Sequence, residues 1–390
     1  MADRRRGPAF KVGGRIEPPY FVNREEELAT LLHDARTLAQ SNVVIAPRRY
    51  GKTALLRAVE DRLTAEMLVA YVNCLGALRV VDFHDRLVEA VLRALERRRG
   101  KGKRLLATWR DVLRKPVVGM RELLEEIGGS LEGVGSVRLK FRAREVDEAT
   151  LLEAALDFPE QLAEEANELV LIVLDEFQAL VRFNEGLFSL LKERMEAQRR
   201  VVYLFSGSSL RLLHEVFGRE GRSPLYQMVG RLFLREIPPE HVRRFYRRRL
   251  RDVYDAEITD AALDRVVERV GGIPYYFQKL GVTLERRLVL RGVRRVDASE
   301  VEEAFQELLE ELSADFQERW ETRLSEQQRA ILQQLAHGPQ TATEIARGLG
   351  VAAPNLSYNL GRLTEAMILT KEERSYRITD RVFAAWIRRL

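Results

Sequence analysis

The stretch that decides the fold is Ala46-Pro-Arg-Arg-Tyr-Gly-Lys52-Thr53, which lies between the apolar run Val43-Val-Ile45 and a helix-like segment that begins at Ala54. A strand that ends in a tight loop and then opens a helix leaves several backbone N–H groups pointing at one spot, where the helix dipole also favours an anion. The Gly-Lys-Thr ending is typical of a phosphate-binding loop, in which the lysine reaches the outer phosphates and the hydroxyl holds Mg²⁺. The predicted nucleotide-binding residues of this loop are Ala46, Pro47, Arg48, Arg49, Tyr50, Gly51, Lys52, Thr53 and Ala54.

The loop departs from the usual pattern at two points. Ala46 stands where the pattern has glycine, which matters only if that position needs a positive φ. Arg48 and Arg49 are unusual in such a loop; they either assist phosphate binding or face solvent or acidic partners.

A second segment supplies acidic groups. Glu168-Leu-Val-Leu-Ile-Val-Leu174-Asp175-Glu176 contains six aliphatic residues without alternation, which predicts a central parallel strand buried on both faces. Open α/β sheets place their chemistry at the carboxyl ends of such strands. Asp175 would then bind Mg²⁺ and Glu176 would polarise an attacking water. Asp-Glu after a strand is otherwise a helix N-cap or a solvated turn, but the phosphate loop in the same chain favours an ATPase site with Lys52 and Glu176 as catalytic groups.

Composition excludes several classes of protein. The 390 residues suggest two or three domains, and the single cysteine, Cys74, excludes a disulfide framework and a cysteine-based zinc site. No apolar run is long enough to span a bilayer, and we expect neither a signal peptide nor a membrane partner but a cytoplasmic location. Charged residues make up 32% of the chain, which suits a thermophile, and the net charge of +5 permits nucleic-acid binding without requiring it.

The pattern divides the chain into four parts. Residues 1–20 form a basic, irregular arm, and residues 21–238 form an α/β domain whose repeated helix-strand order predicts a parallel sheet. Residues 239–315 are expected to form a purely helical lid, and residues 323–390 a separate C-terminal module. The expected strands of the sheet are Asn42–Ile45, Leu68–Cys74, Leu169–Leu174, Val201–Ser206 and Leu232–Ile237. A helical insert of about residues 77–165 is predicted to carry helices over 82–99, 107–113, 121–127 and 149–167 and a strand over 137–142.

The C-terminal module has the pattern of a winged helix. A helix over 325–337, a capping box at Thr341-Ala-Thr-Glu344 and a helix over 354–367 precede a charged hairpin over 370–379. In such a module the second helix can enter a major groove while the wing touches phosphates. Double-stranded DNA is therefore one expected partner; alternatively the module contacts a protein or packs on its own ATPase core. The candidate DNA-binding residues are Asn355, Tyr358, Asn359, Arg362, Lys371 and Arg374.

Several motifs together resemble a known family. Phe21-Val-Asn-Arg24-Glu25-Glu-Glu27 resembles the N-terminal motif of the STAND P-loop NTPases, with Asn23 in the place of a glycine. The phosphate loop and Asp175-Glu-Phe-Gln178 resemble those of the archaeal-type ATPase branch of that AAA+-related class. The segments 205–209, 223–226 with Arg231, and 271–277 resemble its sensor-1 segment, a later loop and its Gly-x-Pro motif, and a winged helix follows the lid there too.

The resemblance implies an AAA+-like P-loop fold, ATP (or ADP) with Mg²⁺, and further site residues. Arg24 and Pro274 are implied nucleotide contacts, although Arg24 also suits an ion pair at a helix start. Ser206 or Ser208 would sense the γ-phosphate, or would cap the following helix. Arg231 is either an arginine finger or a structural ion pair.

Two functions from different classes, and a third variant, follow. The first is a slowly hydrolysing ATP-dependent switch that presents or withdraws the winged helix. The second is an oligomerising AAA+ motor or loader on DNA, akin to origin-recognition ATPases, against which the missing arginine in residues 271–280 argues. The third is a scaffold ATPase whose winged helix binds a protein partner.

Overall fold

The computed structural model describes residues 7–99, 148–182, 185–208, 215–217, 225–292 and 294–390. Its contacts divide the chain into two compact units, which we call the α/β unit (residues 24–45 and 55–233) and the helical unit (residues 1–23, 46–54 and 234–390). The helices expected over 107–113 and 121–127 and the strand over 137–142 lie outside the described residues. No helix in the described ranges is long and apolar enough to cross a membrane.

A five-stranded parallel sheet forms the centre of the α/β unit, in the order β2-β3-β4-β1-β5. Its strands are β1 (Ser41–Ile45), β2 (Leu68–Asn73), β3 (Val170–Asp175), β4 (Val201–Gly207) and β5 (Val229–Phe233). Every residue of β3 and β4 is buried, as the unbroken aliphatic runs predict for central strands covered on both faces. The α/β fold with a parallel sheet is thus confirmed.

The last strand differs from its expectation. β5 covers Val229–Phe233, whereas the sequence pattern placed it over 232–237. The N–H of Ile237 instead donates to the carbonyl of Gly272 at 2.8 Å, within the helical unit. A Cβ at Gly272 would lie 1.9 Å from the Ile237 oxygen, so the close approach requires glycine. The apolar run therefore continues into another pairing, not along the sheet.

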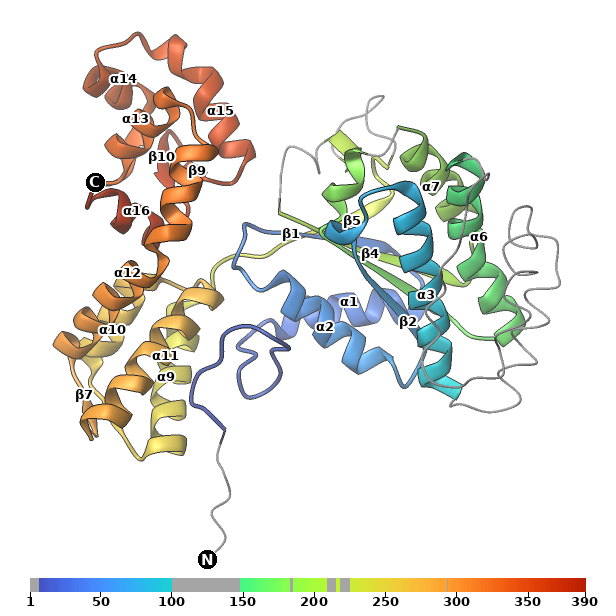
Figure 1. Ribbon diagram of the computed structural model, residues 1–390, viewed down its shortest axis with the longest axis horizontal. Coiled ribbons are helices and arrows are strands. Elements are labelled where there is room, and N and C mark those ends of the chain that lie inside the picture. Colours follow the sequence, from blue (N-terminus) through green and yellow to red (C-terminus); the bar gives the residue numbers. More distant parts are fainter. Residues whose placement is uncertain (1–6, 100–147, 183–184, 209–214, 218–224, 293) are drawn as a thin grey trace, which may run out of the picture. The chain divides into compact units, whose positions relative to one another are not determined.

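Helices α1 (Glu25–Thr37), α3 (Val80–Arg99), α6 (Glu148–Ala166) and α7 (Glu185–Ala197) surround the sheet (Figure 1). α3 packs on β2 and on α6, and α6 also packs on β3, β4 and α7. α2 (Lys52–Leu63) follows the phosphate loop.

A buried carboxylate ties α2 to its neighbours. Glu60 on α2 is 2% exposed and accepts hydrogen bonds from Arg57 at 2.6 Å and from Arg97 of α3 at 2.9 Å. Arg97 also donates to the carbonyl of Val69 in β2 at 2.8 Å. Burial by itself raises the pKa of Glu60, but the two arginines outweigh it and hold the pKa below its usual 4.5.

The helical unit contains four helices that we call the lid: α9 (Pro239–Tyr254), α10 (Asp260–Val270), α11 (Pro274–Arg291) and α12 (Ala298–Thr322). The expectation of helices alone is wrong in one detail, because β6 (Glu257–Ile258) and β7 (Arg295–Val296) form a short parallel pair. This pair fastens the two interhelical connections to each other.

The N-terminal arm is held by the lid. The side chain of Glu285 on α11 accepts from the N–H groups of Ala9 (2.9 Å) and Phe10 (3.3 Å), and Arg249 of α9 donates to the Ala9 carbonyl at 2.8 Å. The Phe10 ring is 1% exposed and packs 4.7 Å from the Tyr246 ring, centroid to centroid. The described part of the arm is therefore irregular but buried in part.

The C-terminal module is a winged helix. Its elements are α13 (Glu326–Leu335), β8 (Gln340–Thr341), α14 (Ala342–Leu349), η3 (Ala353–Leu356), α15 (Ser357–Glu365), β9 (Leu369–Glu372), β10 (Ser375–Ile378) and α16 (Arg381–Ile387). The capping box at Thr341 and Glu344 is formed as expected. The helix expected over 354–367 starts as the 3₁₀ turn η3, becomes α-helical only at Ser357 and ends at Glu365.

The last helix fixes the winged helix to the lid. Phe383 and Trp386 of α16 pack on Phe316 and Trp320 of α12, with ring centroids 5.2 to 6.3 Å apart. The Trp386 Nε1–H also donates to the Ser313 hydroxyl at 3.0 Å. The module is therefore anchored by α16. Its aromatic rings are buried in this cluster, and the indole N–H of Trp386 is hydrogen-bonded there.

Glu60 gives the α/β unit a pH-dependent contribution to stability. Because its folded pKa is depressed, the contribution is complete above about pH 4.5 and is lost as the pH falls through the folded value. We expect Glu60→Gln to lower the free energy of unfolding by about 1–3 kcal/mol at pH 7. Below pH 4 the difference in free energy of unfolding between this variant and the unchanged protein should shrink. Denaturant unfolding across pH 3–7 measures this. Glu66→Gln, which breaks an exposed pair with Arg36, is the control, and an equal effect there would contradict a special role for Glu60.

Phe10 fixes the arm to the lid. Phe10→Ala removes a fully buried ring, so we expect a loss of about 3–5 kcal/mol in the free energy of unfolding of the helical unit. Gly281→Ala should act similarly, because its Cβ would lie 2.1 Å from the Phe10 ring. Calorimetry compares both with Leu290→Ala, which shortens a side chain that is 84% exposed. Equal melting curves for Phe10→Ala and Leu290→Ala would show that the arm adds nothing.

Candidate functional site

The phosphate loop leaves β1 at its carboxyl end and leads into α2. Within the described loop, positive φ values fall on Arg49 (76°) and Gly51 (86°) and not on Ala46. Alanine in the first position of the motif therefore causes no backbone strain. The strained position is Arg49 instead, and a non-glycine residue held at positive φ needs support from its surroundings.

The loop lysine lies over its own main chain. Lys52 is 5% exposed, and its Nζ donates to the carbonyls of Ala46 (3.0 Å) and Pro47 (3.2 Å). Thr53 follows in the first turn of α2 and is exposed. A buried ammonium beside the N-terminal turn of a helix provides the positive charge and the backbone donors that a polyphosphate requires.

The acidic pair ends β3 in the α/β unit. Asp175 is 1% exposed; one carboxylate oxygen accepts from the Tyr71 hydroxyl at 2.5 Å, and the other accepts from the Ser206 hydroxyl and, at 3.1 Å, from the Glu176 N–H. Burial, followed by the charge of Asp175, raises the pKa of Tyr71. The hydroxyl therefore keeps its proton and acts as a donor to the carboxylate.

Glu176 is held by a second set of donors. Its Oε2 accepts from the Ser208 hydroxyl at 2.9 Å and from the Gln178 amide, and the same amide lies 3.2 Å from the Ser208 oxygen. The residue itself has a φ of 54°. Ser206 and Ser208, expected to sense a phosphate, thus each donate to one of the two carboxylates at the end of the neighbouring strand.

The remaining implied nucleotide contacts lie in varied settings. Arg24 is 5% exposed and pairs with Glu27 at 2.8 Å, which forms the ion pair named above as its alternative. Asn23, in the place of the family's glycine, has a φ of 58°, a conformation that asparagine tolerates better than most residues. Arg231 on β5 donates to the carbonyl of Phe217. Pro274 opens α11, and its ring lies 3.6 Å from where a Cβ on Gly51 would stand.

The candidate DNA-binding residues are spread over the 3₁₀ turn η3, α15 and the wing. Tyr358 on α15 is 73% exposed, and Asn355 is also exposed. Asn359 donates to Gln327 of α13, and Arg362 pairs with Glu365 at 4.0 Å. Lys371 and Arg374 are exposed in the hairpin, as expected, although acidic neighbours reduce the local charge. On the same segment Leu356, Leu360 and Leu363 are buried.

Comparison with known proteins agrees with this geometry. A family described as ATPase domains predominantly from Archaea matches residues 21–280, and a helix-turn-helix domain matches residues 324–372. The chain belongs to this archaeal-type ATPase family. No curated protein matches it.

Two solved structures share the fold of this ATPase. The Walker-type ATPase PABY2304 of Pyrococcus abyssi is 19% identical, covers 97% of this chain and 99% of its own, and has a TM-score of 0.67. The ORC2 protein of Aeropyrum pernix, solved in ADPNP–ADP complexes, is 14% identical over 98% and 97%, with a TM-score of 0.57. At this identity the two structures support the P-loop ATPase fold, while the family matches give the nucleotide-binding ATPase domain and the C-terminal helix-turn-helix.

The oxygen donors suit Mg²⁺. Thr53 offers a hydroxyl and Asp175 a carboxylate, the hard oxygen ligands that this ion prefers. Among the described residues no group of three or more acidic, histidine or cysteine side chains could hold a metal.

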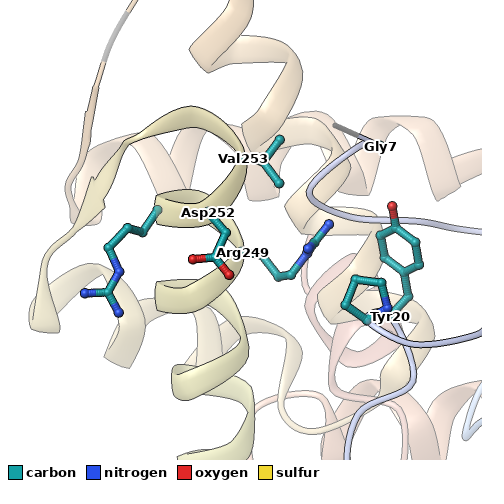
Figure 2. A pocket seen from close by; sticks show the side chains of 7 residues that line it. Gly7, Tyr20, Arg249, Asp252 and Val253 are labelled. Carbon is teal, nitrogen blue, oxygen red and sulfur yellow. The ribbon is translucent and has the colours of Figure 1, made fainter. Parts of the chain in front are cut away.

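One open pocket of the ATPase lies elsewhere. A volume of about 600 Å³ is lined by the arm and by α9, and Figure 2 shows Tyr20 and Arg249 side by side on its wall. None of the predicted nucleotide residues contributes to it. Arg249 there donates to the Pro8 and Ala9 carbonyls, so it stabilises the docked arm.

Sequence reasoning missed four residues around the candidate groups. Tyr71, Gln178, Tyr276 and Asp380 contact Asp175, Glu176 or Arg49. Gln178 stood in the quoted motif without a role, and the β2 position of Tyr71 gave no signal of its own. Tyr276 and Asp380 depend on tertiary contacts that no spacing shows.

Gln178 and Ser208 orient the carboxylate that we expect to act as the base. We expect Gln178→Ala to lower kcat for ATP about 10–100-fold with little change in KM, because Glu176 loses its position and not its substrate. Steady-state ATP hydrolysis measures this. Gln198→Ala is the matched control, since that amide donates to the Leu156 carbonyl in the same unit. A rise in KM alone would contradict an orienting role.

Proposed function

We propose that this ATPase is a slow ATP-dependent switch whose nucleotide state controls DNA binding by the winged helix. One observation carries the proposal: the module is anchored to lid helix α12 by α16, while Tyr358 of α15 and Asn355 of the preceding 3₁₀ turn stay exposed. A movement of the lid can therefore carry the anchored winged helix, with its exposed residues, toward DNA or away from it.

Each chemical role rests on a group already described. Lys52 and the loop N–H groups bind the phosphates, and Glu176 accepts a hydrogen bond from the attacking water and polarises it. Thr53 and Asp175 would supply oxygen ligands for Mg²⁺, which would neutralise charge on the transferred phosphate. The hydrogen bonds that Glu176 accepts from Gln178 and Ser208 keep its carboxylate in one orientation.

DNA contact is supported by the types of side chain on the module more than by the positive charge of the module. Asparagine and arginine on the second helix are residue types that read base edges, and Lys371 and Arg374 can contact phosphates. The pairing of Arg362 with Glu365 favours readout over strong non-specific attraction. The alternatives remain a loader that oligomerises on DNA and a scaffold that binds protein.

Binding of labelled duplex DNA tests the switch, at two salt concentrations with no nucleotide, with ADP and with ATP·Mg²⁺. We expect Lys52→Ala to lose the nucleotide effect and Glu176→Gln to bind ATP yet hold one DNA affinity, since it cannot hydrolyse it. Tyr358→Ala should weaken DNA binding about 10-fold or more at unchanged ATP affinity. Leu390→Ala, exposed on the same module, is the control. DNA affinity that is zero in every state would end the proposal and favour a protein partner.

A further inference from the structure

The side chain of Arg49 leaves the phosphate loop and ends among lid and winged-helix groups of the helical unit. Its guanidinium donates to the Tyr276 hydroxyl and lies 3.8 Å from a carboxylate oxygen of Asp380 and 3.7 Å from one of Asp315. The rings of Tyr275 and Tyr276 lie 5.0 Å from it, and the ring of Phe316 lies 5.4 Å away. Aromatic faces and carboxylates together form a strong site for one cation.

Asp380 is shared between the loop and the winged helix. One carboxylate oxygen accepts from the Phe383 N–H at 2.9 Å and so caps α16, the helix that anchors the module. The other oxygen accepts from the Tyr276 hydroxyl and faces Arg49. A second arginine, Arg319 of α12, lies in the field of the same carboxylate; burial lowers its pKa, and Asp380 acts against that shift.

The main chain of the loop is held from the same side. The Tyr275 N–H donates to the Arg49 carbonyl at 3.2 Å, and Arg49 keeps its φ of 76°. Gly51, two residues on, faces the Pro274 ring. The first turn of α11 therefore supports the strained part of the loop where the phosphates would bind.

We infer that Asp380 is a positioning residue that holds Arg49 in place of the ATP phosphates, so that ATP and the anchored winged helix compete for one cation. The inference rests on the proposed function, because it requires ATP in the loop. Arg49 is placed in a phosphate-binding loop and yet neutralised by acidic groups of the lid and of the module. Phosphate binding that draws Arg49 away from Asp380 weakens the attachment at α16, and by reciprocity the attachment weakens ATP binding.

The competition predicts that one variant binds ATP more tightly than the unchanged protein and that another binds it more weakly. Asp380→Asn removes the negative charge but keeps a side-chain oxygen to cap α16, so the fold is preserved. We expect it to bind ATP·Mg²⁺ at least about 5-fold more tightly, the lower end of usual coupling between sites. Arg49→Ala should bind ATP more weakly, and adding Asp380→Asn to it should change nothing further. Titration of a fluorescent ATP analogue measures all four proteins of this cycle.

A second readout follows the module itself. Hydrogen exchange of the α16 amides should rise when ATP is added to the unchanged protein and should already be raised in Asp380→Asn without nucleotide. Glu372→Gln, which removes an exposed charge of the wing paired with Arg377, is the control and should alter neither readout. Unchanged or weaker ATP affinity in Asp380→Asn, or additive effects in the double variant, would overturn the inference.

The outcomes separate this inference from the switch. ATP affinity and α16 exchange that respond as described while no DNA binds would end the DNA proposal and keep the competition. Nucleotide-dependent DNA binding with no effect of Asp380→Asn would keep the switch and end the competition. A protein that binds no ATP would end both.

Discussion

Complete burial of β3 and β4 is the constraint on which the α/β unit depends. A strand that is covered on both faces cannot carry a charge along its length, so Asp175 and Glu176 appear only where β3 ends. Asp175 at that end is itself 1% exposed and needs donors, which Tyr71 and Ser206 supply from the two adjacent strands. Sheet order therefore selects the donors to Asp175, because β2 and β4 are the strands that flank β3.

The same physics explains what the sequence could predict. Aliphatic runs identified four of the five strands to within a residue at each end, since burial on both faces leaves an unmistakable pattern. β5 was misplaced because it lies at the sheet edge, where burial alternates, and because the apolar residues after it pair with the Gly272 segment. Capping boxes and proline located the helices of the winged helix, because these signals act between residues that are close in the sequence. The division into an arm, an α/β domain, a lid and a winged helix stays a prediction.

The site was predictable only where chemistry is local. Lys52, Thr53, Asp175 and Glu176 follow from loop and strand patterns. Tyr71 and Ser206, the partners of Asp175, lie on other strands, and Tyr276, the partner of Arg49, is more than 200 positions away from it. Their selection depends on tertiary geometry, for which one sequence offers no spacing. Backbone strain was equally hidden: the motif drew attention to Ala46, whereas the positive φ falls on Arg49.

That displacement of strain has a structural consequence. A glycine at the Arg49 position would adopt its φ without cost and would need no support. An arginine there costs conformational energy, and the structure recovers it through a cation site made of two tyrosines, a phenylalanine and two carboxylates. The loop conformation consequently depends on groups that the lid and the winged helix contribute. A change in those groups should therefore alter the loop, because they contact the side chain of the residue that carries its positive φ.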